Sequence, residues 1–183
     1  NFVPIYESRE SLHGIYSYSS DDYIGFLESD EGLWRESRSG DHSLEIGVGR
    51  LPVKSIEEAE TINEKIIRYA TSQRTFGDWR NKFVYIADDG DNGKHMSQGE
   101  AFSEIIKASS PEVNIRKIYL DAFDQDLANA EKSPSMQRAL LAQIRDGAFI
   151  IDYMGHGNEV GLMQEGVITT QFINQLDNRH KLP

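Results

Sequence analysis

The residue in this sequence best suited to chemistry is His156, which stands between Gly155 and Gly157. A glycine before the histidine lets the backbone turn sharply, and a glycine after it leaves a main-chain amide open to a ligand. An exposed imidazole beside a free N–H suits a general base next to an oxyanion donor. The other interpretation is a tight turn whose histidine points into solvent. A triplet this short does not decide between the two.

A second candidate is the acidic loop at residues 88–93, Asp-Asp-Gly-Asp-Asn-Gly. Its carboxylates could hold an imidazole in one tautomer, bind a cation, or form a solvated turn. The loop matches a calcium-binding EF-hand poorly. A count from Asp88 puts Gly93 correctly in sixth place, but Gly90 and Gly99 fall third and twelfth, where carboxylates belong. An orienting acid and a solvated turn remain open, ahead of a metal site.

The other histidines show no spacing typical of metal ligands, and we expect them at the surface: His13, His42, His95 and His180. We expect the two tryptophans, Trp34 and Trp79, to be packing residues rather than stacking platforms.

Composition narrows the classes of function. The 183 residues contain no cysteine, so they hold no disulfide, no thiolate zinc site and no thiol nucleophile. Thirty acidic and 19 basic side chains give a net charge of −11, which argues against nucleic-acid binding because phosphates require clustered Lys and Arg. The sequence shows no signal peptide and no apolar run of ~20 residues, so we expect no membrane insertion by this segment.

The elements that would position these residues alternate between strand and helix. Apolar runs and period-two patterns predict strands at 44–53, 82–87, 115–122 and 148–154. Three- and four-residue spacing predicts helices from a capping box at 55–58 to about residue 70, and at 97–108, 133–147 and 170–176. We expect one domain over residues 1–183, with 1–45 as an irregular, loop-rich entry and 46–183 as the alternating part.

This alternation predicts an α/β fold with a mostly parallel sheet covered by helices on both faces. In such sheets ligands bind beyond the carboxyl ends of the strands. The acidic loop follows the strand at 82–87, and Gly155-His156-Gly157 follows the strand at 148–154. We therefore expect both loops at the same edge of the sheet.

Several ordered blocks of the sequence resemble gingipain-type cysteine peptidases, and most closely the gingipain-like sortases of the type IX secretion system. The resemblance runs from about Ser20 to Pro183. The blocks are Ile46-Gly47-Val48-Gly49-Arg50-Leu51-Pro52-Val53, Glu57-Glu58-Ala59 with Lys65-Ile66-Ile67-Arg68-Tyr69, Phe76-Gly77-Asp78-Trp79-Arg80, Ala87-Asp88-Asp89-Gly90-Asp91, and Asp152-Tyr153-Met154-Gly155-His156-Gly157.

The resemblance implies a three-layer caspase-like fold in which His156 is the catalytic histidine and the amide of Gly157 helps to form the oxyanion hole. Asp89 matches the acid that supports the histidine, where gingipains carry Glu, and Asp88 is the alternative. The nucleophilic Cys of this family lies on the next strand. We therefore expect a chain truncated before the nucleophile strand, inactive alone although its parent is a cysteine peptidase.

The resemblance also carries expectations about specificity and surroundings. Met96 aligns with a substrate-pocket Asp of arginine-specific members, so we do not expect cleavage after arginine. Calcium binding is implied without assigned ligands, and no cofactor is required. The implied partners are protein or peptide substrates and other secretion-system components, outside the cell or on the outer-membrane surface. An unpaired sheet edge predicts self-association or a disordered tail near Lys181. The alternative to an enzyme is a non-catalytic binding or scaffold module of the secretion machinery.

Overall fold

The computed structural model describes residues 3–7, 12, 19–28, 31, 43–126, 128 and 132–183. The chain divides into two compact units, residues 1–63 and 64–183, which are described separately. His13, His42 and Trp34 lie outside the described residues.

The first unit contains a two-stranded antiparallel ladder, β1 (Tyr6–Glu7) and β2 (Ser19–Ser20), followed by a 3₁₀ helix at Asp22–Ile24. The Arg50 side chain donates hydrogen bonds to both oxygens of Asp21 and to the main-chain oxygen of Pro4. The hydrogen bonds from Arg50 hold the pKa of Asp21 below its usual value. This ion pair links three distant stretches of a unit that has little regular structure.

The predicted strand at 44–53 is wrong, because these residues form an irregular extended segment. Its apolar side chains, Leu44, Ile46 and Leu51, are exposed. Glu45 N donates a hydrogen bond to Gly25 O at 3.2 Å, which ties this segment to the residues after the 3₁₀ helix. Alternation produces a strand only where a neighbouring strand and an apolar layer receive its two sides, and the described residues of this unit place no strand beside the segment.

Helix α1 (Ile56–Thr71) begins at the predicted capping box. Ser55 Oγ accepts a hydrogen bond from Glu58 N at 3.2 Å, as the motif requires. The Glu58 carboxylate accepts from Lys54 N at 2.6 Å, one residue before the usual partner. The helix is confirmed, although its apolar stripe is only half-buried at Ala59 and Ile62, and Ile56 and Ile66 are exposed.

The second unit is built on a parallel sheet of β3 (Lys82–Ala87), β4 (Asn114–Tyr119) and β5 (Ile150–Met154), in the order β4-β3-β5. The predicted strand at 82–87 matches β3 residue for residue. The strand predicted at 115–122 ends earlier, because residues Leu120–Ala122 turn into a 3₁₀ helix. Trp79 is buried just before β3 and confirms its predicted packing role.

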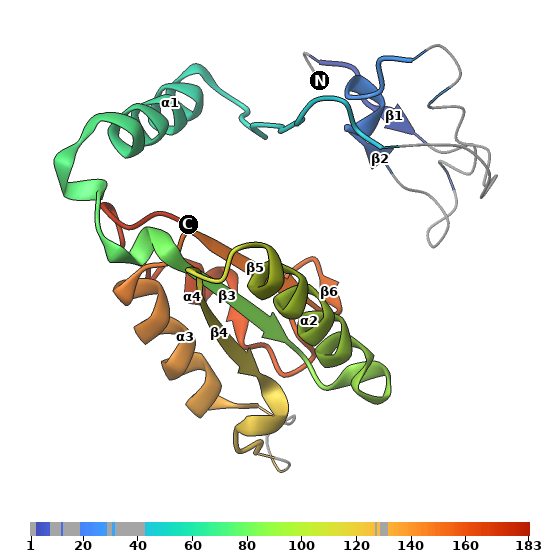
Figure 1. The fold of residues 1–183 in the computed structure, drawn as a ribbon, viewed down its shortest axis with the longest axis vertical. Coiled ribbons are helices and arrows are strands. Elements are labelled where there is room, and N and C mark those ends of the chain that lie inside the picture. The colour runs from blue at the N-terminus through green and yellow to red at the C-terminus, as the bar shows by residue number, and fades with distance from the viewer. Residues whose placement is uncertain are drawn as a thin grey trace. The chain divides into compact units, whose positions relative to one another are not determined.

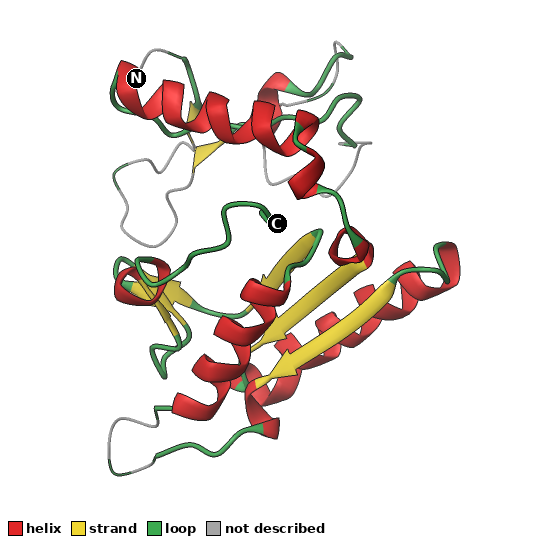
Figure 2. Ribbon diagram, turned by 90° about the vertical axis from the view of Figure 1, so that its left-hand side faces the viewer, coloured by secondary structure: helices red, strands yellow, loops and turns green. Residues whose placement is uncertain are grey.

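Helices α2 (Gly90–Ser109) and α3 (Pro134–Asp146) cover opposite faces of this sheet (Figures 1 and 2). The chain moves from β3 to β4 through α2, then returns past β3 to β5 through α3. Because parallel crossovers are right-handed, this reversal of direction puts the two helices on opposite faces. The predicted α/β fold, with a parallel sheet between helices, is confirmed.

The hydrophobic core lies on the α3 side of the sheet. Side chains of β3 and β4 meet α3 and the segment after β5; the cluster comprises Val84, Ile86, Ile118, Leu120, Met136, Leu140, Ile144, Ala148, Met163, Val167 and Phe172. Since side chains alternate along a strand, Tyr85 and Ala87 of β3 point to the other face, toward α2. There the helix contributes small residues, Gly99 and Ser103.

A small antiparallel sheet follows β5 and was not predicted. It comprises β6 (Gly157–Asn158), β7 (Gly161–Leu162) and β8 (Ile168–Thr169), and leads into the short helix α4 (Thr170–Ile173). Asn158 Oδ1 accepts hydrogen bonds from Val160 N and Gly161 N at 2.9 and 3.1 Å, which closes the turn between β6 and β7.

None of the helices in the described part of the chain is long and apolar enough to cross a membrane.

Candidate active site

The site lies where the sheet changes its direction of winding. The strands β3 and β5 are neighbours, yet the chain leaves β3 toward β4 and returns to β5 from the other side. Ligand sites of open α/β sheets lie at such switch points, beyond the carboxyl ends of the strands. Ala87 and Met154 pair at these ends, so Asp88 and the Gly155-His156 turn leave the sheet side by side. The expectation that the two loops meet is confirmed.

Asp88 is the centre of the site and is 4% exposed. Its Oδ2 accepts a hydrogen bond from the main-chain N of His156 at 2.9 Å. Its Oδ1 accepts from Gly90 N at 3.1 Å and forms a short contact with His95 Nδ1. Burial pushes the pKa of Asp88 up, but the hydrogen bonds from His156, His95, Tyr153 and Gly90 outweigh it, and the pKa lies below its usual value. Asp88 is therefore a charged anchor.

Tyr153 and Gly155 complete this anchor. The Tyr153 hydroxyl lies 3.1 Å from Asp88 Oδ2 and 2.7 Å from the main-chain O of His156, and its single proton is shared between these acceptors. Burial, then the charge of Asp88, raises the pKa of Tyr153 far above its usual value, so it stays a neutral donor. A Cβ at Gly155 would lie 2.2 Å from Asp88 Oδ2 and from the Tyr153 hydroxyl. Only glycine allows this approach.

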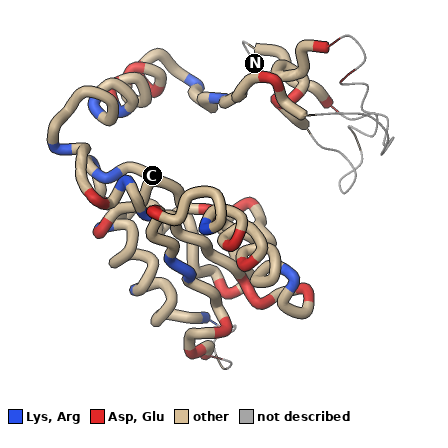
Figure 3. Tube along the Cα trace, viewed as in Figure 1, with Lys and Arg blue, Asp and Glu red and all other residues tan. Residues whose placement is uncertain are grey.

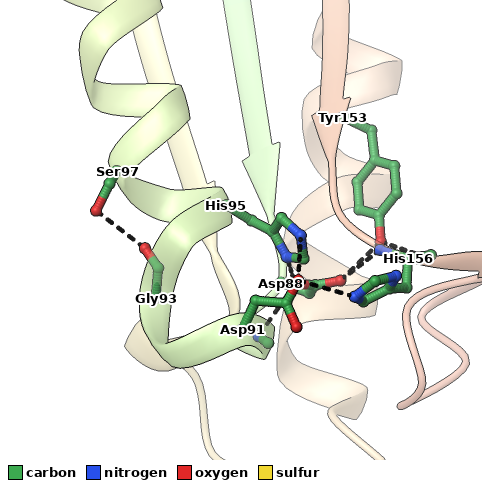
Figure 4. Close-up of polar contacts among 8 residues, drawn as sticks. Asp88, Asp91, Gly93, His95, Ser97, Tyr153 and His156 are labelled. Carbon is green, nitrogen blue, oxygen red and sulfur yellow. Dashed lines mark hydrogen bonds and ion pairs between the residues drawn. The ribbon is translucent and has the colours of Figure 1, made fainter. Parts of the chain in front are cut away.

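The backbone of His156 is held by hydrogen bonds, while its ring is exposed. Its N–H is bound by Asp88, and its carbonyl accepts from Met163 N at 3.0 Å. The side chain is 68% exposed, and Nε2 lies 3.2 Å from Asp91 Oδ2. Its ring meets that of His95 edge to face, with centroids 5.0 Å apart (Figure 4). The turn is therefore fixed through its backbone, and it presents an exposed imidazole beside Asp91 and His95.

Gly157 follows as the first residue of β6, paired with Leu162. The neighbouring pair, His156 and Met163, is hydrogen-bonded, and such pairs alternate with non-hydrogen-bonded ones along an antiparallel ladder. Gly157 thus stands at a non-hydrogen-bonded position, and its N–H faces away from β7. This amide remains available to a ligand.

The two acids predicted to support the histidine, Asp88 and Asp89, differ in how they lie relative to His156. Asp88 reaches His156 through its main chain. Asp89 turns away from it, and its Oδ2 accepts a hydrogen bond from Gln125 Nε2 at 2.7 Å. Among the described residues, the carboxylate beside the His156 ring is that of Asp91. Met96, the predicted pocket residue, is half-buried on α2, and its Cε packs beside Gly93.

The expectation that His95 lies at the surface is wrong, since it is 8% exposed and its two ring nitrogens face Asp88 and Asp91. His95, Gly99 and Ser103 recur every four residues and are the buried residues of α2. That spacing was the signal available in the sequence, because residues four apart share one face of a helix. His180, by contrast, is half-buried.

A left-handed turn at the start of α2 carries Asp91 to the histidines. Asp91, Asn92 and Gly93 have φ of 53°, 56° and 77°. For residues with a Cβ this conformation costs roughly 1–2 kcal/mol each, although Asn and Asp tolerate it better than most. Ser97 Oγ supports the turn by donating to Gly93 O at 3.0 Å (Figure 4). Strain of this kind is typical of functional sites.

Negative charge gathers at this edge of the sheet (Figure 3). Acidic residues follow both β3 and β4; they are Asp88, Asp89, Asp91, Asp121, Asp124 and Asp126. Such an edge attracts cations and cationic groups.

A parallel sheet between helices, with a histidine and a buried carboxylate at its switch point, is consistent with the class of caspase-like α/β domains. Within that class, the family model for peptidase family C25 matches residues 1–183, so the chain belongs to this family, the gingipain family of cysteine peptidases. No curated protein and no solved structure gives a significant match to the chain. The predicted family and the general class of cysteine peptidase are confirmed.

Proposed function

We propose that this chain supplies the general base and one oxyanion-hole donor of a C25 cysteine peptidase, with His156 as the base and Gly157 N–H as the donor. The observation that carries the proposal is the clamp of Asp88 on the main-chain N–H of His156, which holds the loop and leaves the imidazole exposed. The nucleophilic thiol belongs to residues outside these 183, which contain no cysteine.

The position of Asp91 favours one tautomer of His156. When Nε2–H donates to Asp91 Oδ2, Nδ1 carries the lone pair and becomes the proton acceptor. Nδ1 then takes the proton of the thiol, and the thiolate attacks the peptide carbonyl carbon. The oxygen of that carbonyl becomes negative and accepts from Gly157 N–H.

The same nitrogen completes the cycle. Protonated His156 gives its proton to the leaving amine, so that the peptide C–N bond breaks and a thioester remains. Water or an amine then attacks the thioester and loses a proton to His156, and the thiol is regenerated. In this scheme Asp88 is a positioning residue that acts through the main chain. The predicted role of Asp89 would require its carboxylate to leave Gln125.

The assignment to a particular kind of peptidase, a sortase, rests on the resemblance to the sortase PorU. In this proposal an amine, rather than water, attacks the thioester, so the enzyme is a sortase of the type IX secretion system. It acts on secreted proteins outside the cell or on the outer-membrane surface. We expect no turnover from this chain alone, because it lacks the thiol.

Peptide cleavage by the intact enzyme tests the proposal. We expect His156→Ala to lower kcat/KM about 10²–10⁴-fold, the usual contribution of a positioned base. His180→Ala, a change in another histidine of the same unit, serves as the matched control and should leave kcat/KM within about threefold. Equal activity of the two variants would contradict the proposal, and a parent without any cysteine would point instead to the non-catalytic module.

A further inference from the structure

We propose that Asp91, His95 and His156 form a binding site for one divalent metal ion of the zinc type. The consequence for catalysis, drawn below, rests on the proposed function, but the site itself does not. Asp91 and His95 lie in the first part of α2, and His156 lies in the turn after β5, at the switch point of the sheet (Figure 4).

The distances from Asp91 to the two histidines match those between the ligand atoms of a zinc site. His156 Nε2 lies 3.2 Å and His95 Nε2 lies 3.6 Å from Asp91 Oδ2, and all three atoms lie within 4.8 Å of one another. Tetrahedral zinc with bonds of about 2.0–2.2 Å separates its ligand atoms by roughly 3.3–3.6 Å. Asp91 and His156 are both exposed, so their side chains have room to rotate toward one ion.

His95 is prepared for a metal by its second nitrogen. Its Nδ1 is bonded to Asp88, a carboxylate that already accepts from Gly90 N and His156 N. When Nδ1–H donates to Asp88, the lone pair stands on Nε2, the atom that faces Asp91 and His156. A carboxylate behind the ligating histidine is the usual second layer of zinc sites, where it fixes the tautomer and the ring orientation. The contact between His95 Nδ1 and Asp88 involves a residue outside the three proposed ligands, so it is a second, separate observation in favour of the site.

The donor set selects the kind of ion. Two imidazoles and one carboxylate suit Zn²⁺ and its neighbours in the first transition row. Calcium and magnesium require six or more oxygen ligands, or an octahedron of oxygens and waters, which two imidazoles cannot provide. Three protein ligands leave a fourth position open to water. The carboxylates of Asp88 and Asp89 add to the attraction for a cation.

A metal ion at this site would prevent His156 from acting as a general base. The ion takes the lone pair of Nε2, so a neutral imidazole must carry its single proton on Nδ1. Nδ1 is the atom that accepts the thiol proton in the proposed mechanism. Metal binding and catalysis are therefore mutually exclusive, and zinc would act as a reversible inhibitor of the intact enzyme.

The test is metal binding by the 183-residue chain. Zn²⁺ is titrated in competition with a chromogenic chelator, and Co²⁺ is added separately to record the visible absorption of tetrahedral cobalt. We expect one ion per chain and the tetrahedral spectrum. Asp91→Asn and His156→Ala should each weaken Zn²⁺ binding at least about tenfold. His180→Asn is the matched control and should leave it unchanged.

The two exposed ligands keep this test independent of folding. His95→Gln removes a buried side chain and is interpreted only if its thermal unfolding remains cooperative; Asp91→Asn and His156→Ala do not depend on that condition. Equal affinity of wild type, Asp91→Asn and His156→Ala would overturn the metal site, as would an octahedral cobalt spectrum. Neither result would affect the proposed function, which is tested by peptide cleavage without added metal.

Discussion

The two faces of the β4-β3-β5 sheet are covered by helices of very different composition. On one face, α3 buries Met136, Leu140 and Ile144 against β3 and β4. On the other, the buried residues of α2 are His95, Gly99 and Ser103, and its large apolar side chains Phe102 and Ile105 are exposed. A Cβ at Gly99 would lie 2.7 Å from the Tyr119 hydroxyl, so small residues let α2 approach the sheet closely.

This difference separates stability from chemistry. The α3 face removes large side chains from water and supplies the hydrophobic free energy. Helix α2 buries no large apolar side chain of its own, but it brings a histidine and a left-handed turn up to Asp88. The effects of substitutions should follow the same division, with loss of stability on one face and loss of the site on the other.

The largest effect on stability should come from Leu140→Ala on the α3 face. Leu140 is fully buried in the core, and the cavity left behind adds to the lost transfer free energy, for a total of about 2–5 kcal/mol. Ile105→Ala, an exposed residue of α2, should change the free energy of unfolding by less than about 0.5 kcal/mol. Urea unfolding of the two variants measures both. Similar losses would show that α2 packs as α3 does.

The next effect should come from Asp88→Asn at the end of the α2 face. The amide has one accepting oxygen for the donors that the carboxylate holds, so buried N–H groups lose partners, at a cost of about 1–3 kcal/mol. Asp89→Asn is the adjacent control, because its partner is the Gln125 amide. Hydrogen exchange at the His156 amide should rise in the first variant only. Equal exchange rates in the two variants would contradict the role of Asp88 as the anchor of the loop.

A gain in stability should come from Asn92→Gly. Asn92 has φ of 56°, where glycine carries no Cβ penalty, so relief of strain should stabilise the chain by about 1 kcal/mol. The control is Asn174→Gly, since Asn174 has φ of −66° and gains nothing from glycine. Thermal unfolding compares the two. A loss of stability in Asn92→Gly would contradict the left-handed turn.

The smallest effect concerns pH and the ion pair of Lys82 with Asp146, which joins β3 to the end of α3. The hydrogen bond from Lys82 holds the pKa of Asp146 below its usual value of 3.8. A lowered pKa adds stability above pH 3.8 that is lost as the pH falls through the folded value. Asp146 is 60% exposed, so the contribution is less than about 1 kcal/mol. Asp146→Asn should lose stability at pH 6 but not at pH 2; an equal loss at both would exclude the ion pair as the cause.

The sequence predicted what local pattern controls. The continuous apolar run of β3, the Ser133-Pro134 start of α3 and the Ser55 cap of α1 each carry their signal within a few residues, and each element is present. The prediction of a strand at 44–53 was wrong because an alternating apolar pattern does not specify which strand would pair with it. The ladder β6-β7-β8 was missed because its strands are two residues long and depend on the Asn158 turn.

The sequence predicted which loops form the site, but it did not predict where their side chains point. The order of strands places the ends of β3 and β5 together, so the meeting of Asp88 with His156 follows from topology. The approach of Asp91 depends on the left-handed turn at 91–93, and the direction of Asp89 depends on Gln125, which is distant in the sequence. His95 was assigned to the surface because its neighbours in sequence are polar, whereas its neighbours four and eight residues on are buried.

The most direct test is the rate at which iodoacetamide alkylates the thiols of the intact enzyme at neutral pH, followed by mass spectrometry in wild type and in His156→Ala. If His156 is the base, one cysteine of the wild type will react far faster than the others, and in His156→Ala it will slow to the rate of an ordinary thiol. Equal rates at every cysteine in the two proteins would contradict the role of His156.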